Sequence, residues 1–356
     1  MKTIKNFVIL GNSNQKIVNN QLHSIGGAEL QIHTLALELG RLGHSVFLIY
    51  PGEDNITIAD KYFTIHSIPL NWAKPKGIYE LFKKMCALSP DIIITRAANP
   101  LLIIYALISK IIHAKLIYFS AHDWELANGK HLSGWRWQLF RLGIQFCSVL
   151  FVQNEYQFQG FKGLLWKSSR VVRTKNLPLL DPVEKTSNVG DYFLWIGTYR
   201  PHKRPEMVVE LAKQLPDTEF IIVLHCLGKE KTKRRFEKET QGLNNLNFMN
   251  GVIRDQMSGL YANARALLIT SESEGFPNVA LEAWSQGRAV ITTPSTALSG
   301  LTEKQGCIIV ETLDDFKKII KSKSSDRLCN IGMNGLKYFK RNYSKDLIMD
   351  KVTSYL

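Results

Sequence analysis

The sequence predicts an α/β protein with two doubly wound domains, each a parallel sheet covered by helices on both faces. Three observations carry this prediction. The chain has 356 residues, which exceeds the usual size of a single hydrophobic core. Short apolar runs typical of buried parallel strands alternate with helical patterns almost throughout. This alternation stops at a segment rich in proline, polar and turn residues, 176–190, and then restarts.

The expected strands follow this alternation, and helices fill the gaps between them. In the first half they are 7–10, 45–50, 91–95, 115–119, 148–152 and 170–173, and in the second half they are 192–196, 219–224, 266–269 and 289–292. Helices are expected at 205–215, 326–340 and 344–355, among others. We therefore expect an N-terminal domain over 1–180, a C-terminal domain over 181–340 and a final helix within 341–356.

Composition and cysteine usage are those of a globular cytoplasmic protein. Apolar residues make up 45% of the chain and charged residues 21%. The cysteines are odd in number, widely scattered and without metal-ligand spacing, so we expect reduced thiols at 86, 147, 226, 307 and 329. The apolar run at 7–10 is too short for a signal-peptide core. The run at 101–109 falls well short of the ~20 residues that a membrane span needs, and we expect a buried helix there.

The net charge of +14 is concentrated in the N-terminal half. Residues 1–180 contain 20 Lys and Arg against 10 Asp and Glu, whereas residues 181–356 contain 25 against 21. A basic surface attracts polyanions, and both nucleic acid and an anionic bilayer qualify. The alternative is that the charge serves solubility alone.

Two glutamates eight residues apart, Glu274 and Glu282, are the most informative feature of the chain. The first lies on a Gly/Pro loop after the strand 266–269, and the second on the first turns of the following helix. The segment between them supplies loop and helix-start backbone that suits a ligand with both hydroxyls and a phosphate. Its candidate donor-binding residues are Gly275, Phe276, Pro277, Asn278 and Val279. The alternative is that both are exposed glutamates, with Glu282 favouring the helix dipole.

A basic loop at 197–205 follows the first strand of the C-terminal half. Its cations, Arg200, Lys203 and Arg204, would lie where a diphosphate leaving group develops charge. The alternative is a solvated basic turn.

Two loops of the N-terminal half also follow the carboxyl ends of predicted strands, where such sheets bind ligands. Gly26 and Gly27 precede a helix and allow close approach of the backbone to an anion. His122 follows the strand 115–119 and could donate a hydrogen bond or carry a proton near neutral pH. Each feature alone is also compatible with a purely structural role.

The segment 271–287 closely resembles the E-x7-E signature of the retaining glycosyltransferases of family 4, also called group 1 glycosyltransferases. The run Gly-Gly-Ala-Glu at 26–29, followed by 39–46, resembles the first βαβ unit of the same family. The resemblance implies the GT-B fold, in which two Rossmann-like domains face a central cleft. The N-terminal domain would then be the acceptor side and the C-terminal domain would bind the nucleotide sugar. In relatives the last helix crosses back to the N-terminal domain.

The resemblance also implies roles for single residues. Glu274 would face the donor sugar and Glu282 would bind the ribose. The backbone amides of the loop between them would bind the sugar and the diphosphate. The glycines at 26 and 27 would approach the donor phosphate, and His122 would meet the donor sugar.

The basic loop matches the family pattern only in part. Lys203 stands at the position of the family's lysine, but Thr198 occupies the place of its arginine. Arg200 lies two residues later, and we expect it to contact the phosphate in place of that arginine.

No Asp-x-Asp pair occurs in the sequence. A metal-dependent transferase would need such carboxylates to hold a divalent ion on the diphosphate. We expect no metal and no cofactor, in agreement with the metal-independent chemistry of the family. Same-face attack guided by the leaving phosphate fits best, and double displacement with Glu274 as nucleophile is the alternative mechanism.

The expected activity is hexosyl transfer from a nucleotide diphosphate sugar, with UDP favoured over GDP, to a glycan or lipid-linked acceptor in bacterial-type surface polysaccharide or glycolipid synthesis.

The segment 134–147 mixes aromatic residues with arginines, as interfacial helices do, or is an ordinary packing helix. We expect a cytoplasmic protein, with an anionic surface on the inner face of the cell membrane as a further partner and no nucleic acid. A sugar-nucleotide epimerase with the same fold and a non-enzymatic basic binder of nucleic acid or membrane are the alternatives. No G-x-G-x-x-G fingerprint of a nicotinamide dehydrogenase follows the first strand.

Overall fold

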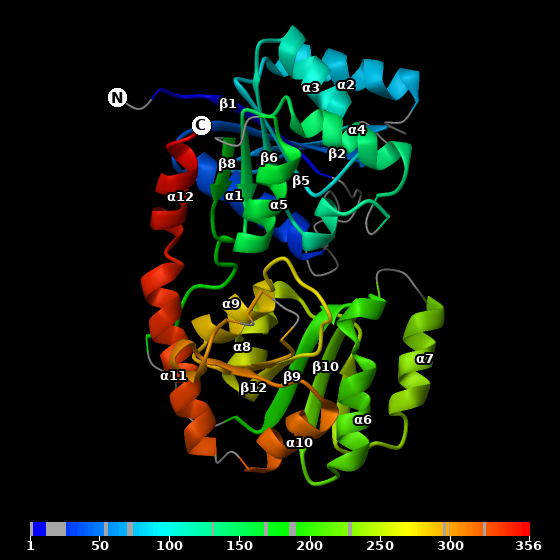
Figure 1. Ribbon diagram of the computed structural model, residues 1–356, viewed down its shortest axis with the longest axis vertical. Helices are drawn as coiled ribbons and strands as arrows, with labels where there is room; N and C mark the ends of the chain where they lie inside the picture. Colours follow the sequence, from blue (N-terminus) through cyan, green and yellow to red (C-terminus); the bar gives the residue numbers. More distant parts are fainter. Residues whose placement is uncertain are drawn as a thin grey trace. The chain divides into compact units, whose positions relative to one another are not determined.

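The protein is described by a computed structural model in which helices and strands follow the alternation of the sequence (Figure 1). The described residues are 3–11, 26–52, 56–69, 74–129, 132–166, 170–184, 190–226, 230–294, 297–298, 300–322 and 325–356. They form two compact units. The first contains the described residues up to Leu177 together with Asp346–Leu356, and the second contains Pro178–Lys345.

The first unit is built on an eight-stranded sheet in the order β3-β4-β2-β1-β5-β6-β7-β8. All neighbouring strands are parallel except β3, which pairs antiparallel with β4 at the edge. Its strands are β1 (Asn6–Leu10), β2 (Ser45–Gly52), β3 (Ile56–Ala59), β4 (Thr64–Pro69), β5 (Ile92–Arg96), β6 (Lys115–Phe119), β7 (Val149–Val152) and β8 (Val171–Arg173). The central strands are almost wholly apolar, as expected of strands buried on both faces.

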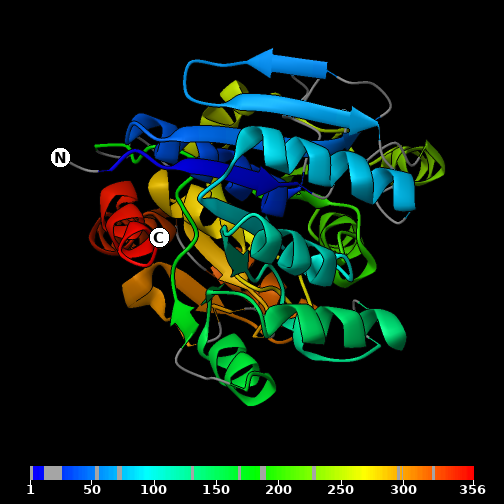
Figure 2. The same cartoon turned by 90° about the horizontal axis from the view of Figure 1, so that it is seen from above.

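The helices of the first unit are α1 (Gly27–Arg41), α2 (Pro75–Leu88), α3 (Leu102–Ile111), α4 (Trp135–Ile144), α5 (Glu155–Leu164), α12 (Lys345–Thr353) and the 3₁₀ turn η2 (Asp123–Leu126). Helices α2, α3 and α4 lie side by side on one face of the sheet (Figures 1 and 2). Their inward side chains, such as Leu81, Tyr105 and Phe140, join alternate residues of the strands in one apolar core. The C-terminal residues also belong to this unit, since Lys5 and Lys115 both donate through Nζ to the carbonyl of Leu356, at 2.8 and 3.1 Å.

The second unit has a six-stranded, fully parallel sheet in the order β11-β10-β9-β12-β13-β14. Its strands are β9 (Tyr192–Thr198), β10 (Glu219–His225), β11 (Leu246–Met249), β12 (Ala264–Ile269), β13 (Ala289–Thr292) and β14 (Cys307–Ile309). Its helices are α6 (Glu206–Gln214), α7 (Glu230–Thr240), α8 (Met257–Ala262), α9 (Asn278–Ser285), α10 (Leu313–Ser322) and α11 (Ser325–Asn342), with 3₁₀ turns η4 (Pro201–Lys203), η5 (Arg254–Gln256) and η6 (Glu303–Gln305).

The chain passes from the first unit to the second after Leu177, and each side of this passage is hydrogen-bonded within its own unit. Gln31 of α1 brackets the backbone of Leu177, donating to its carbonyl at 2.7 Å and accepting from its N–H at 2.9 Å. On the other side, Val183 N donates to the carbonyl of Ser285 at the end of α9 (2.9 Å). Residues 185–189 of the predicted linker lie outside the described residues.

The predicted parallel α/β architecture is confirmed, with two departures. The strands β3, β4, β11 and β14 were not expected. The segment predicted as a buried helix at 101–109 is a helix, α3, but it is buried on one side only: Leu107 and Ile111 are 55% and 64% exposed. Within the part of the chain that the structure describes, no helix is long and apolar enough to cross a membrane.

Candidate active site

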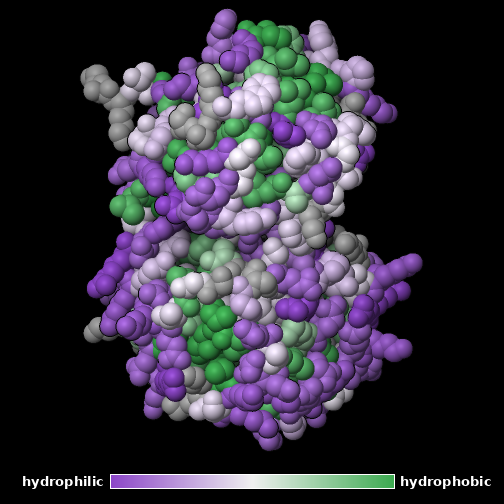
Figure 3. Space-filling view, viewed as in Figure 1, coloured by the Kyte–Doolittle hydropathy of each residue, from purple (hydrophilic) through white to green (hydrophobic). Residues whose placement is uncertain are grey.

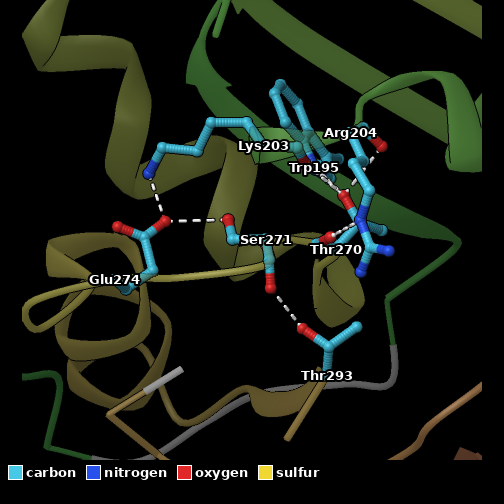
Figure 4. Close-up of polar contacts among 7 residues, drawn as sticks. All are labelled: Trp195, Lys203, Arg204, Thr270, Ser271, Glu274 and Thr293. Carbon is cyan, nitrogen blue, oxygen red and sulfur yellow. Dashed lines mark hydrogen bonds and ion pairs between the residues drawn. The ribbon is translucent and has the colours of Figure 1, made fainter. Parts of the chain in front are cut away.

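The candidate site of the second unit begins with the basic loop after β9, which is fixed against the end of β12 (Figure 4). The hydroxyl of Thr270 lies 2.6 Å from the carbonyl of Lys203 and 2.9 Å from that of Arg204, and it accepts from the indole of Trp195 at 3.0 Å. Arg204 Nε donates to the carbonyl of Thr270 at 2.8 Å. These bonds hold Arg204 at a φ of 46°, a left-handed conformation that costs a non-glycine residue about 1–3 kcal/mol. The loop is therefore preorganised.

Glu274 lies on the loop after β12 and is nearly buried, with 7% exposure. Its Oε1 forms an ion pair with Lys203 Nζ and accepts from the hydroxyl of Ser271 at 2.8 Å. Thr293 Oγ1 in turn donates to the carbonyl of Ser271 at 2.5 Å (Figure 4). The structure thus brings together the two sequence motifs that supply a carboxylate and a cation.

The helix α9 begins directly after this loop. Gly275, Phe276 and Pro277 lead into it, and Pro277 occupies the N-cap without a side-chain cap. Asn278 and Val279 form its first turn, at the end of the helix that carries the positive part of the macrodipole. The carboxylate–cation pair of Glu274 and Lys203 therefore lies beside a helix start that favours anions.

Glu282 is on the same helix and is 3% exposed. Each of its oxygens has a partner: Arg254 donates to Oε1 at 2.7 Å, and the hydroxyl of Tyr261 donates to Oε2 at 2.7 Å. Burial, followed by the charge of Glu282, raises the pKa of Tyr261 well above its usual value, so this phenol remains a donor. Glu282 is thus a buried, oriented carboxylate rather than a solvated helix charge.

The three predicted cations of the basic loop do not lie together. Lys203 pairs with Glu274, whereas the Arg204 guanidinium binds backbone at Thr270. The side chain of Arg200 is exposed, and its carbonyl accepts from Lys203 N at 2.9 Å in the turn η4. Lys203 is accordingly the best-placed cation of the three.

In the first unit, Gly26 is the N-cap of α1 and Gly27 is its first residue. A Cβ added at Gly26 would meet no atom of the described residues within 4 Å, and its φ of −77° is open to any residue. Neither its conformation nor its contacts with the described residues thus require glycine at position 26.

His122 follows β6 and caps the turn η2. Its Nδ1 accepts from the N–H of Trp124 at 3.2 Å, which places the proton of the neutral ring on Nε2. The buried Glu125 orients the loop by accepting from Tyr118 and Ser120 hydroxyls at 2.6 and 2.7 Å and from His122 N at 3.2 Å. This geometry makes His122 Nε2 a hydrogen-bond donor.

The partners of the two glutamates were not found from the sequence. Arg254 and Tyr261 lie 28 and 21 residues before Glu282, and Ser271 carries no distinguishing motif. Tyr261 is indistinguishable from a core aromatic residue until its hydroxyl is placed. Among the described residues, no group of three or more His, Cys, Asp or Glu is arranged to hold a metal ion.

Solved structures with the same fold span nearly the whole chain. The Anabaena protein HepE in complex with UDP and glucose has a TM-score of 0.78 at 16% identity, covering 98% of both chains. Sucrose-phosphate synthase from Thermosynechococcus elongatus has a TM-score of 0.77 at 14% identity, covering 98% of both chains. An α,α-trehalose-phosphate synthase (UDP-forming) from Burkholderia vietnamiensis has a TM-score of 0.68 at 9% identity, covering 99% of both. The fold is therefore GT-B.

Sequence families match both halves of the chain. Residues 25–162 match the family described as Glycosyltransferase Family 4, and residues 190–324 match Glycosyl transferases group 1. No curated protein matches the sequence. The chain belongs to the group 1 glycosyltransferases of the GT-B type.

Replacing Arg254 by methionine is expected to lower the free energy of unfolding by about 3 kcal/mol, because the Glu282 carboxylate then stays buried without its cation. Urea unfolding measures this change. The double variant R254M/E282Q should recover part of the loss, since it removes both charges. As a control, Arg327→Met breaks an exposed pair with Glu303 and should cost less than about 1 kcal/mol. Equal losses of unfolding free energy for the two single variants would show that the Arg254–Glu282 pair contributes no more to stability than an exposed pair.

Proposed function

We propose that the protein is a retaining, metal-independent hexosyltransferase that uses a nucleotide diphosphate sugar. A UDP-sugar is favoured because HepE structures contain UDP and UDP-glucose, and a GDP-sugar is the alternative. The acceptor is a glycan or a lipid-linked sugar of bacterial-type surface polysaccharide or glycolipid synthesis. One observation carries the proposal: the ion pair of Lys203 and Glu274 lies beside the start of the helix that bears the oriented Glu282.

Each part of this arrangement has a proposed role. Lys203 and the start of α9 stabilise the diphosphate as it leaves. Glu274, fixed by Ser271, accepts from hydroxyls of the donor sugar, and Glu282 accepts from the ribose. The roles of Arg200 and Arg204 on the diphosphate stay predictions, since neither side chain lies with Lys203. The roles of Gly26, Gly27 and His122 stay predictions.

The proposed reaction is a same-face substitution at the anomeric carbon. The bond from this carbon to the diphosphate oxygen breaks, and its electron pair stays on the diphosphate. The acceptor hydroxyl oxygen forms the new bond on the same face, and its proton passes to a diphosphate oxygen. Positioning and electrostatic stabilisation by Lys203 provide the rate enhancement without a metal ion.

A panel of UDP- and GDP-sugars is expected to raise the melting temperature of the protein selectively. At a ligand concentration 100-fold above Kd, binding to the folded state alone adds about 2.7 kcal/mol of stability. The shift should persist in EDTA if no metal is needed. Thermal-shift measurements would check both points.

The matched variants are Glu282→Ala and Glu219→Ala. Glu282→Ala should lose the ligand-induced shift, whereas Glu219, exposed at the start of β10, lies at the opposite end of its strand from the candidate site and its variant should keep the shift. A panel without any shift, or an equal shift in both variants, would contradict the proposed donor site.

We further propose that the enzyme acts in the cytoplasm and associates with the inner face of the cell membrane, where a lipid-linked acceptor would be presented.

A further inference from the structure

Exposed apolar side chains gather on two neighbouring helices of the first unit. On α3 these are Leu107 and Ile111, one turn apart, at 55% and 64% exposure. On α4 and just beyond it, Trp135, Leu142 and Phe146 follow one stripe, at 67%, 41% and 40% exposure. We call these five residues the α3–α4 face.

The α3–α4 face is continuous because the two helices pack closely. Gly143 of α4 lies against the backbone of Leu102 and Ile103, so close that an added Cβ would come within 3.0 Å of them. Figures 1 and 2 both show α3 and α4 side by side, and hydrophobic residues gather over α3 in the view of Figure 3. The inward residues Tyr105, Phe140 and Ile144 already supply the core. The outward apolar residues are therefore in excess of what packing of the first unit uses.

The charges on α3 and α4 are of one sign. Neither α3 nor α4 contains an Asp or Glu, and Lys110, Arg136 and Arg141 are exposed. The guanidinium of Arg136 lies 5.5 Å from the ring centre of Trp135, and that of Arg141 lies 5.7 Å from that of Trp137. Neighbouring α2 and its N-cap add exposed lysines at 74, 76 and 83, together with one half-buried carboxylate, Glu80. On α3 and α4, tryptophan beside arginine, with aliphatic residues and no carboxylates, is the composition of an interfacial membrane surface.

We propose that the α3–α4 face docks on an anionic lipid bilayer, with its apolar side chains in the headgroup region and its cations on lipid phosphates. The α3–α4 face would be the place where the protein meets a lipid-linked acceptor. This purpose rests on the proposed function, whereas the binding to a bilayer does not. A second copy of the chain is the other candidate occupant. In a symmetric dimer the same patch meets itself, which would bring the cations of both copies, Lys110, Arg136 and Arg141, into one interface without carboxylates of α3 or α4 to pair with them. Charge complementarity therefore favours the bilayer.

Binding to vesicles tests this proposal directly. The full-length protein is sedimented with phosphatidylglycerol–phosphatidylcholine vesicles and with pure phosphatidylcholine vesicles, at low and high salt. We expect binding to the anionic vesicles that weakens as salt rises, and much weaker binding to the neutral ones. No binding to anionic vesicles at low salt would overturn the proposal.

Matched variants separate the α3–α4 face from net charge. The triple variant K110Q/R136Q/R141Q should bind anionic vesicles about 100-fold more weakly, at about fivefold for each cation removed. The variant K231Q/R234Q/K238Q removes the same charge from exposed positions of α7 in the second unit and should bind like the wild type. An equal loss in both triple variants would mean that only overall charge attracts the protein, and the proposal would fail.

The apolar part has its own variants. L107S/I111S should weaken binding about tenfold or more. In the bound state Leu107 and Ile111 would leave water for the bilayer, and serine gains no such free energy. Leu347→Ser, at a 58% exposed position of α12, should have no effect. Sedimentation velocity provides the counter-test: a wild-type dimer that L107S/I111S dissociates would assign the face to self-association instead.

The donor-induced thermal shift is measured on every variant. All face variants should keep it, which shows that they fold and that their donor site is intact. A protein that binds vesicles but shows no donor-induced thermal shift would refute the proposed function and leave the membrane face standing. A protein that shows the thermal shift but does not bind vesicles would refute the membrane face and leave the proposed function standing.

Discussion

Replacing Lys203 by methionine is expected to lower kcat for sugar transfer by about 10²- to 10³-fold, the usual effect of removing one preorganised group that stabilises developing negative charge. Lys203 is the cation that the structure fixes beside the start of α9, because the Thr270 hydroxyl donates to its backbone carbonyl. Because charge on the diphosphate grows as the sugar bond breaks, the loss should fall mainly on kcat and less on KM for the donor. Steady-state kinetics at saturating acceptor measure both.

A matched control is Lys321→Met, which removes an exposed lysine of α10. It should leave kcat unchanged within twofold. The double variant K203M/E274Q is needed as well, since Lys203→Met also leaves Glu274 without its ion-pair partner. If Lys203→Met lowered only the melting temperature, and kcat stayed at the wild-type level, Lys203 would hold the loop and would have no role in the leaving step.

Replacing Glu274 by glutamine is expected to lower transfer by about 10- to 100-fold and to leave clearly measurable turnover. The variant keeps the shape of the side chain and loses a charged acceptor, and hydrogen bonds to charged groups contribute about 1.5–3 kcal/mol. Same-face substitution needs no covalent bond to this residue. Double displacement would instead require Glu274 as the nucleophile, and glutamine could not replace it.

Glu272→Gln is the control, because Glu272 is exposed two residues earlier on the same loop. Its variant should transfer sugar at the wild-type rate. A glycosyl adduct on Glu274 detected by mass spectrometry, or complete loss of transfer in Glu274→Gln while the donor-induced thermal shift persists, would favour double displacement.

The sequence was sufficient to predict the architecture because the central strands are continuous apolar runs. The run at 115–119 coincides with β6, and that at 289–292 with β13. The strands that were not expected lack this signal. β3 is largely exposed, β14 has three residues, and β4 contains the polar pair His66 and Ser67. Their pairing is decided by neighbouring strands and not by local composition.

The candidate site shows the same division between local and distant information. The spacing of Glu274 and Glu282 predicted a loop and a helix start, and the structure places them there. The partners that orient them come from other elements, since Arg254 lies on η5, Tyr261 on α8 and Lys203 on η4. Such contacts depend on how the elements pack, which no local pattern encodes. The exposed stripe of α3 was missed for a related reason: an apolar run gives no sign of which of its sides faces solvent.

We propose that the residues around Glu274 and Glu282 transfer a sugar with retention of configuration. The most direct test follows, by proton NMR, the anomeric signal of the sugar released to water or acceptor from the nucleotide sugar that gives the largest thermal shift. We expect the wild type to release first a sugar with the configuration of the donor, and Lys203→Met to slow this release at least 100-fold. Release with inverted configuration, or an undiminished rate in Lys203→Met, would contradict the proposal.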